Sequence, residues 1–378
     1  MPIGSDKGSF IKPGFDPLAA QTSVSASDLY SWGLNTSGQL GLSDTVDRSS
    51  PVQVGITEWL TVSGGYNWGG GLKTNNTLWT WGNNSAGQLA NGTTGGVFST
   101  PVQVGAYVDW LEVAAGANHS LAIKTDGTLW AWGQNAFGEG GTGATGVINA
   151  PVQIGALTTW ATIAGGFYAS HAIKTDGTLW SWGYGQNGRT GLNNETNYSS
   201  PVQVGSLTTW LNITAGYGWA AAIKTDGTIW MFGKNDRGQL GQGTVSVGIS
   251  SPVQVGALTT WLKIASGAYH VMAIKTDGTL WAWGGNNYGG LGQGNTTNYS
   301  SPVQVGALTT WDKIAGGPFA SYAIKTDGAF WSWGHNNYGQ LGDGTTANKS
   351  SPIQVGALTN WSFLPKMSQA KGPLALQF

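Results

Sequence analysis

A unit of about fifty residues, repeated along most of the chain, constrains the fold more than any other feature. Its Trp-Gly marker (Phe-Gly once) recurs every 49 to 51 residues, at Trp32, Trp81, Trp132, Trp182, Phe232, Trp283 and Trp333. A second marker, P-[VI]-Q-[VI]-G, recurs in step and begins at Pro51, Pro101, Pro151, Pro201, Pro252, Pro302 and Pro352. A Trp follows each copy of it, at Trp59, Trp110, Trp160, Trp210, Trp261, Trp311 and Trp361. A fixed period of this length indicates a repeat architecture, and the three markers agree on seven units.

Each unit is predicted to contain short strands and no helix. In the segment from Ala122 to Gly133, two alternating runs flank the pair Asp126-Gly127. Asp-Gly between alternating runs is a strong hairpin signal, because both central residues of a type I′ turn need positive φ. Four short strands per unit at this period indicate a β-propeller, whereas a solenoid needs distinct capping repeats, which the chain does not show.

The two ends of the chain predict a closed ring. The first unit begins abruptly at Asp28 without its opening strands, and the last unit ends with a segment that matches the missing part. We therefore expect the strand from Leu374 to Phe378 to pair with the strand from Leu29 to Trp32, which would remove the exposed sheet edges at the seam. The predicted fold is all-β: a seven-bladed propeller of four-stranded blades over residues 28–378, preceded by an extended arm over residues 1–27.

The repeat resembles that of the regulator of chromosome condensation (RCC1) superfamily, of a bacterial or phage type. The matching motifs include Trp132-Gly133-Gln134-Asn135, Gly238-Gln239-Leu240-Gly241 and Gly339-Gln340-Leu341-Gly342. The resemblance extends from about residue 28 to the C-terminus and implies the propeller fold, but a fold does not fix a function. In the family, nucleotide exchange and nucleosome binding are associated with an inserted hairpin and a basic tail. Here no blade carries an insertion, and the leader has only Lys7 and Lys12 as basic residues. A similar bacterial propeller inhibits a secreted β-lactamase through aromatic loop residues on one face.

Composition argues against several classes of partner. The formal net charge is −1 and only 9% of the 378 residues are charged, so we expect no nucleic-acid partner held by bulk electrostatics. The chain has no cysteine, which excludes thiolate chemistry and disulfides. No run of about 18 apolar residues occurs, so membrane insertion is not expected. The N-terminus also lacks the apolar core of a secretory signal.

The titratable residues form no recognisable catalytic or metal-binding pattern. Five aspartates share one Thr-Asp-Gly turn per unit, so turn formation explains them: Asp126, Asp176, Asp226, Asp277 and Asp327. The histidines occupy three different repeat positions without ligand spacing: His119, His171, His270 and His335. We therefore expect no catalytic residue, no metal site, no cofactor and no enzymatic activity.

Differences between the copies indicate where a partner would bind. Six units have a glycine seven residues before the aliphatic residue of the A-I-K motif (Leu72 in the first), and the next three positions vary and are rich in aromatic residues. A constant framework with variable aromatic loops is typical of a binding face. The predicted partner-binding residues are Tyr66, Trp68, His119, Phe167, Tyr168, Tyr217, Trp219, Tyr269, His270 and Phe319. The alternative is that these residues only plug the channel mouth or pack on one another. A second variable set is expected to pack locally, and it includes Phe98, Tyr198 and Tyr299.

The leader predicts a second contact surface. Phe10, Ile11, Phe15 and Leu18 are too apolar for a purely solvated linker, so we expect an anchoring arm that lies on other subunits of an assembly; the alternative is a disordered tail.

The leading functional hypothesis is a non-enzymatic structural or attachment protein, a subunit of a phage-like virion, located in that particle and contacting a surface glycan or receptor. The alternative is a bacterial protein-binding or inhibitor propeller with an aromatic loop face, extracellular or in the bacterial cytoplasm. A third hypothesis is a lectin-like module that stacks sugars on Trp68, Trp219 or Tyr217.

Overall fold

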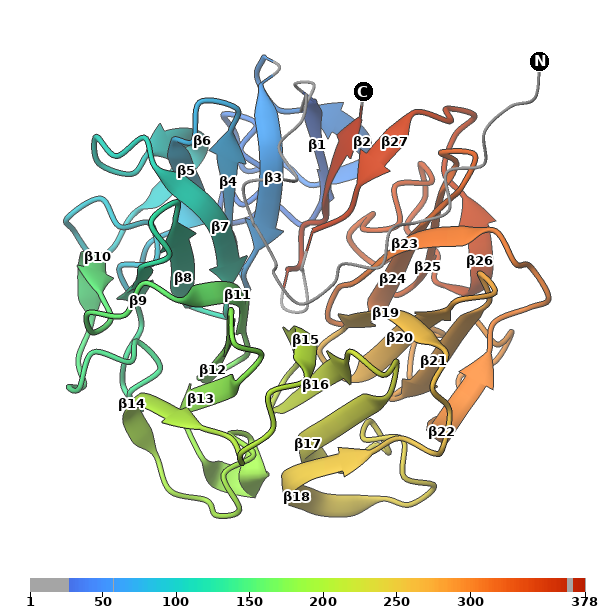
Figure 1. Ribbon diagram of the computed structural model, residues 1–378. Helices are drawn as coiled ribbons and strands as arrows, with labels where there is room; N and C mark the ends of the chain where they lie inside the picture. Colours follow the sequence, from blue (N-terminus) through green and yellow to red (C-terminus); the bar gives the residue numbers. More distant parts are fainter. Residues whose placement is uncertain (1–26, 57, 366–369, 378) are drawn as a thin grey trace, which may run out of the picture.

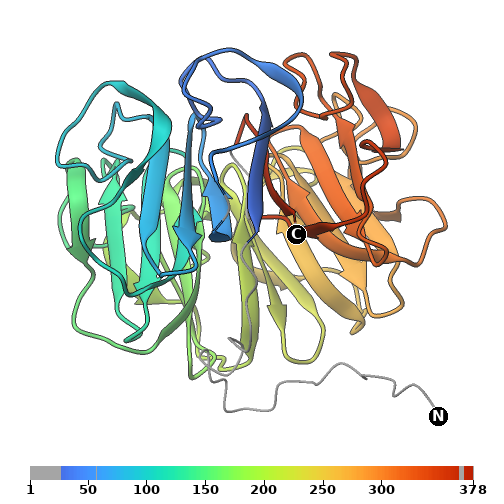
Figure 2. The same ribbon diagram turned by 90° about the horizontal axis from the view of Figure 1, so that it is seen from above.

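The computed structural model describes residues 27–56, 58–365 and 370–377, and it shows seven four-stranded antiparallel sheets arranged as blades in a ring (Figure 1). Seen at right angles to that view, the ring is a disc whose strands run between two faces (Figure 2). The prediction of an all-β, seven-bladed propeller with four-stranded blades is confirmed.

Each blade takes its four strands in order from the channel outwards. Blades 1 to 3 consist of β3 (Trp59–Gly64), β4 (Trp68–Lys73), β5 (Leu78–Asn83) and β6 (Val97–Gln103); β7 (Trp110–Ala115), β8 (His119–Lys124), β9 (Leu129–Gly133) and β10 (Ile148–Gln153); β11 (Trp160–Gly165), β12 (Ala169–Lys174), β13 (Leu179–Gly183) and β14 (Tyr198–Gln203). Blades 4 to 6 consist of β15 (Trp210–Ala215), β16 (Trp219–Lys224), β17 (Ile229–Asn235) and β18 (Ser246–Gln254); β19 (Trp261–Ser266), β20 (His270–Lys275), β21 (Leu280–Gly284) and β22 (Tyr299–Gln304); β23 (Trp311–Gly316), β24 (Ala320–Lys325), β25 (Phe330–Gly334) and β26 (Lys349–Gln354).

Blade 7 joins the two ends of the chain. It consists of β27 (Trp361–Phe363), β28 (Leu374–Gln377), β1 (Asp28–Gly33) and β2 (Arg48–Gln53). β1 pairs antiparallel with β28, with Leu29 opposite Leu376 and Ser31 opposite Leu374. The predicted closure of the ring is therefore confirmed, and its partner residues are as expected from the repeat.

The core lies between blades, where the Trp of each Trp-Gly marker is buried against the preceding blade. Trp81, for example, is fully buried and donates its indole N–H to the carbonyl oxygen of Gln39, at 2.9 Å. Trp182 does the same to the carbonyl oxygen of Glu139, also at 2.9 Å. These rings combine a large apolar area with a satisfied polar group, so the repeated Trp residues are structural.

A second repeated arrangement, a Lys between two Trp rings, holds the inner and third strands together in blades 1 to 6. In blade 3 the Lys174 ammonium lies 3.7 Å from the ring centre of Trp180 and 5.0 Å from that of Trp160. Blade 7, assembled from both chain ends, has no Lys here. Instead Gln377 donates to the side chain of Asn360 at 2.7 Å, and Tyr30 packs edge-on against Trp361.

Candidate functional site

Two sets of loops share one face of the disc. The turn between the first and second strands, which we call the tip, lies on this face, and so does the loop after the third strand. Because successive strands of an antiparallel sheet alternate in direction, both connections emerge at the same end of the blade. The Thr-Asp-Gly turns lie at the other end, where Asp126 accepts hydrogen bonds from the backbone and hydroxyl of Thr128, as a turn aspartate does.

The structure brings five of the ten predicted residues together on the tip face. Phe167 lies 4.3 Å from Tyr168 and 4.2 Å from Tyr217, measured between ring centres. Tyr217 lies 5.2 Å from Tyr269, which stacks on Phe319 at 5.0 Å. All five rings are partly exposed, and they come from blades 3, 4, 5 and 6. Their packing on one another agrees with the alternative considered above, but it leaves part of each ring open to solvent.

Loops after the third strands extend this row of rings at both ends. Phe137 lies 5.2 Å from Tyr168 and 4.4 Å from Tyr184. At the other end Tyr288 lies 5.1 Å from Phe319 and 4.4 Å from His335. Tyr338 completes the row, 6.1 Å from His335. We call the continuous set the aromatic arc, and it consists of Phe137, Phe167, Tyr168, Tyr184, Tyr217, Tyr269, Tyr288, Phe319, His335 and Tyr338.

The sequence analysis missed the five arc members that follow the third strands. A signal for three of them was present: the residue before the glycine of the loop motif N-x-x-G varies between blades, from Ser37 and Ala86 to Phe137, Tyr288 and Tyr338. This third variable position resembles the tips, because its side chain changes between blades while the surrounding framework stays constant.

Four predicted partner-binding residues are buried, which contradicts their assignment. Trp68, His119, Trp219 and His270 are each 1% exposed. They occupy the same repeat position, the first residue of the second strand, and they connect blades instead of facing solvent. Trp68 donates its indole N–H to the carbonyl oxygen of Ala117, and Trp219 donates to that of Ala268, both at 3.0 Å. Sugar stacking on either Trp is therefore excluded in this structure.

The two buried histidines use the same blade-to-blade geometry. His119 Nε2 lies 3.0 Å from Ser170 Oγ, and the Ser170 hydroxyl donates to the carbonyl oxygen of Glu139 at 2.7 Å. Because the serine proton is already used, Nε2–H of His119 is the donor. Burial lowers the pKa of His119 and of His270 to about 4, so both are neutral at pH 7.

The repeated glycine of the tip exists because these rings pack on it. A Cβ at Gly65 would lie 1.9 Å from Trp68 Nε1, and one at Gly116 would lie 2.2 Å from His119 Cε1. In blade 3, where Ala169 takes the ring's place, the nearest atom to a Cβ at Gly166 is 3.2 Å away. The constant glycine and the variable residue three positions later are thus one structural unit.

Tyr66, the remaining predicted residue, lies apart from the arc. It is 36% exposed, and the Lys371 ammonium lies 3.8 Å from its ring centre. Its contacts belong to the junction of blade 1 with the C-terminal segment. The four residues of the predicted anchoring arm, Phe10, Ile11, Phe15 and Leu18, lie outside the described residues.

Hydrogen bonds between neighbouring tips hold the face in one arrangement. The backbone N–H of Tyr66 donates to the Ala117 carbonyl at 3.0 Å, and that of Ala117 donates to the Gly166 carbonyl at 3.1 Å. Further round the ring, Tyr217 N–H donates to Ala268 at 2.9 Å. A surface whose backbone is already fixed loses little conformational entropy when it binds.

Basic groups lie between the aromatic rings. The Arg237 guanidinium is 4.5 Å from the Tyr269 ring centre, and the Lys234 ammonium is 5.8 Å from that of Tyr217. Burial raises the pKa of Tyr269, so its hydroxyl remains protonated at neutral pH. Asp236 pairs with Lys234 at 2.7 Å, so the arc is apolar with charges of both signs beside it, which suits a partner that carries aromatic or aliphatic groups.

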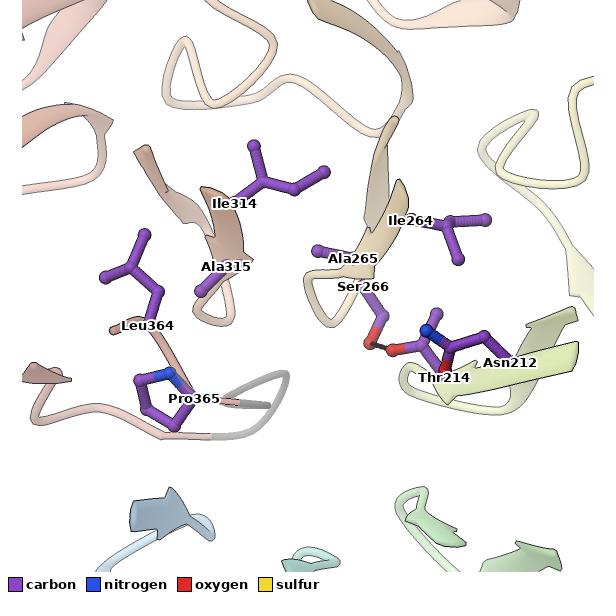
Figure 3. A pocket seen from close by; sticks show the side chains of 10 residues that line it. Asn212, Thr214, Ile264, Ala265, Ser266, Ile314, Ala315, Leu364 and Pro365 are labelled. Carbon is purple, nitrogen blue, oxygen red and sulfur yellow. Dashed lines mark hydrogen bonds between the residues drawn. The ribbon is translucent and has the colours of Figure 1, made fainter. Parts of the chain in front are cut away.

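The central channel offers a cavity but no reactive group. Figure 3 shows it between inner strands β15, β19 and β23, with Leu364 and Pro365 closing one side. Its polar lining includes Thr214 and Ser266, whose hydroxyls bond to each other at 2.6 Å. None of the described residues that line it is titratable, and the described part of the chain holds no group of three His, Asp or Glu residues placed for a metal ion. Among the described residues, no helix is long and apolar enough to cross a membrane.

Comparison with known proteins decides the family. The description "Regulator of chromosome condensation (RCC1) repeat" fits residues 27–68, 75–123, 176–223, 226–274, 277–324 and 327–370. The chain belongs to the RCC1 repeat family. A second form of the RCC1 repeat matches residues 110–139, 261–289 and 311–340, within blades 2, 5 and 6.

Curated members of the RCC1 family match over part of their length. The ultraviolet-B receptor UVR8 of Arabidopsis thaliana is 30% identical over 121 residues, which is 30% of this chain and 27% of the receptor. The RCC2 homolog of Danio rerio is 31% identical over 138 residues, 34% of this chain and 28% of that protein. The alignments thus span roughly a quarter of each relative.

Solved structures share the whole ring. Yeast RCC1 (Prp20), in a structure with Kap60, has a TM-score of 0.84 at 19% identity and covers 100% of this chain and 94% of its own. Human WBSCR16 has a TM-score of 0.84 at 20% identity, covering 93% of this chain and 99% of its own. At these identities the likeness shows the RCC1 fold.

Proposed function

We propose that this RCC1-type propeller is a non-enzymatic binding protein that binds a protein partner through the aromatic arc. The carrying observation is the unbroken row of ten partly exposed rings, contributed by blades 2 to 6 and set on a hydrogen-bonded backbone. Residues that dominate binding at protein interfaces are enriched in Tyr and Trp, because these side chains bury large areas at a small entropy cost.

The family supports a protein partner in general terms. The yeast RCC1 structures are described as bound to Kap60 and as binding Gsp1p and histones. These likenesses are below 20% identity, so they do not identify the partner of this chain.

The experiment compares binding by two double variants. Tyr217→Ser with Tyr269→Ser removes two central rings of the arc, and Leu207→Ser with Leu258→Ser removes two side chains, each 44% exposed, from the opposite face. Proteins captured from the native source by wild type and by both variants are identified by mass spectrometry. We expect a protein that the arc variant loses by about 30-fold or more and that the opposite-face control retains, since hot-spot rings contribute about 2 kcal/mol or more. Equal capture by both variants would refute the arc as the site.

The prediction of a phage-like virion subunit anchored by its arm remains a hypothesis from the sequence. None of the relatives named above is described as a virion component, and the arm residues lie outside the described part of the chain. Deletion of residues 1–27 tests it directly, because loss of particle proteins with retention of arc-dependent binding would separate anchoring from recognition.

A further inference from the structure

One buried position on the tip face departs from the repeat in a way that changes its chemistry. In the loop after the third strand, a glutamine accepts a hydrogen bond from the backbone N–H two residues earlier. Gln88 accepts from Ala86 at 2.8 Å, and Gln340 accepts from Tyr338 at 2.9 Å. Blade 3 has Arg189 at this position, immediately after the 3-10 turn η1 (Gln186–Gly188). A guanidinium has no acceptor atom, so Arg189 cannot perform this structural role.

Arg189 is left with unused donors. Its side chain is 7% exposed, and Nε and Nη1 have no hydrogen-bond partner among the described residues. Its described neighbour is aromatic: the guanidinium lies 4.9 Å from the ring centre of Tyr184. Burying an unpaired charge is costly, and a strongly desolvated charge at a cleft marks a candidate functional group.

A narrow recess, closed in this conformation, lies between this guanidinium and the arc. Phe167, Tyr168, Arg189 and Gly218 line it, so two arc rings form its rim. Gly218 has φ +108°, a conformation that side chains rarely adopt, and a Cβ there would lie 3.0 Å from Arg189 Nε. Other tips carry Asn, Tyr or Phe at the position of Gly218. The absent Cβ therefore leaves the space in which the guanidinium itself lies, and a side chain at position 218 would displace it.

The nearest acidic residue of the repeat does not neutralise Arg189. Glu139, which replaces the glutamine in blade 2, accepts from the Phe137 N–H at 2.7 Å through Oε2. No ion pair between Glu139 and Arg189 exists in the described structure, and burial raises the pKa of Glu139. Asp236, further along the arc, is already paired with Lys234 at 2.7 Å.

We propose that Arg189 is the anchor for a carboxylate, the side chain of an Asp or Glu residue that the protein partner brings to this recess when the partly exposed rings of Phe167 and Tyr168 move aside. This inference rests on the proposed binding function and specifies the chemistry of the partner. A guanidinium and a carboxylate match in geometry and form strong, charge-assisted hydrogen bonds.

The test uses two variants that both restore the glutamine of the repeat, Arg189→Gln and Glu139→Gln. A random dodecamer peptide library is panned on wild-type protein, and selected peptides are then measured against both variants by isothermal titration calorimetry. We expect enriched peptides to carry an Asp or Glu next to aromatic or aliphatic residues. Their affinity should fall about 10- to 100-fold on Arg189→Gln, the range for a charged hydrogen-bonded pair, and hold or rise on Glu139→Gln.

A double-mutant cycle identifies the pair. Changing the acidic residue of the best peptide to its amide should weaken binding to wild type by the same factor, with no further loss on Arg189→Gln. Peptides without an acidic residue, no enrichment at all, or equal affinity for wild type and Arg189→Gln would overturn the proposal. Arc-dependent peptides that lack acidic residues would overturn this inference alone. Peptides that still bind after Tyr217→Ser with Tyr269→Ser would instead count against the proposed function.

Discussion

The buried histidines make the stability of the ring sensitive to mild acid, and His119 provides the clearest test. Its Nε2–H donates to Ser170, and its Nδ1 is buried without a hydrogen-bond partner among the described residues. Protonation would place a second N–H, and a charge, where no acceptor exists. This explains why burial lowers the pKa of His119 to about 4.

The sign of the effect follows from proton binding in the two states. In the unfolded chain the pKa of a histidine is about 6.5, so that chain binds a proton below pH 6.5 while folded His119 stays neutral down to about pH 4. The stability that neutral His119 contributes is therefore fully present above pH 6.5, and it is lost as the pH falls toward about 4. With these two values, the loss between pH 7.5 and pH 5 is about 2 kcal/mol for this residue. His171, with a pKa lowered to about 3, and His270 add losses of similar size.

His119→Ala isolates the contribution, because Ala169 and Ala320 occupy the same repeat position. At pH 7.5 we expect the variant to be less stable by about 2 kcal/mol, from lost packing and one lost hydrogen bond. Ser170 keeps its bond to the Glu139 carbonyl, so no hydroxyl proton is orphaned. At pH 5 the difference should shrink to nearly zero. Urea unfolding, followed by tryptophan fluorescence at several pH values, measures this difference in the free energy of unfolding. Glu139 is present in both proteins, so its own titration cancels in the difference. A stability difference that stays constant from pH 7.5 to pH 5 would refute the conclusion that His119 is buried in its neutral form.

Two further perturbations test the packing of the ring. Gly116→Ala should lower the free energy of unfolding by about 3 kcal/mol or more, because its Cβ would lie 2.2 Å from His119, whereas Gly166→Ala, with its nearest atom at 3.2 Å, should change it by less than about 1 kcal/mol. Thermal unfolding of both proteins decides this, and similar midpoints would contradict the packing explanation. Leu376→Asp places a charge in a fully buried site of the closing strand, 1% exposed, and should cost about 3 kcal/mol or more relative to Leu376→Val. Comparable circular-dichroism melting curves for these two variants would show that the ring does not depend on this seam.

The fold was predictable because its signals are local and repeated. Asp126-Gly127 fixes a hairpin, the spacing of Trp81 and Trp132 fixes the blade, and the half-units at the two chain ends fix the closure between Leu29 and Leu376. None of these inferences needed side-chain contacts between blades.

The site was predictable only in part because burial depends on those contacts. Phe167 and Trp219 lie one and three residues after the constant glycines of equivalent tips, yet one is partly exposed and the other is 1% exposed. The difference lies in the strand: Trp219 is the first residue of β16, so its ring turns between blades and fills the space that Gly216 leaves open. A variable aromatic position can thus be core, and the constant glycine three residues earlier was the available signal.

Departures from the repeat locate function better than the repeat itself. Glu139 and Arg189 replace the same glutamine in adjacent blades, and Gly218 opens the tip beside them. The two changes at the glutamine position cost stability, since each buries a charge and Arg189 also removes an acceptor. Arg189 and Gly218 line one recess together with Phe167 and Tyr168, which argues that these two changes act together. Restoring glutamine at position 189 should therefore leave the propeller at least as stable while it weakens recognition, and that is the separation of stability from binding expected of a site.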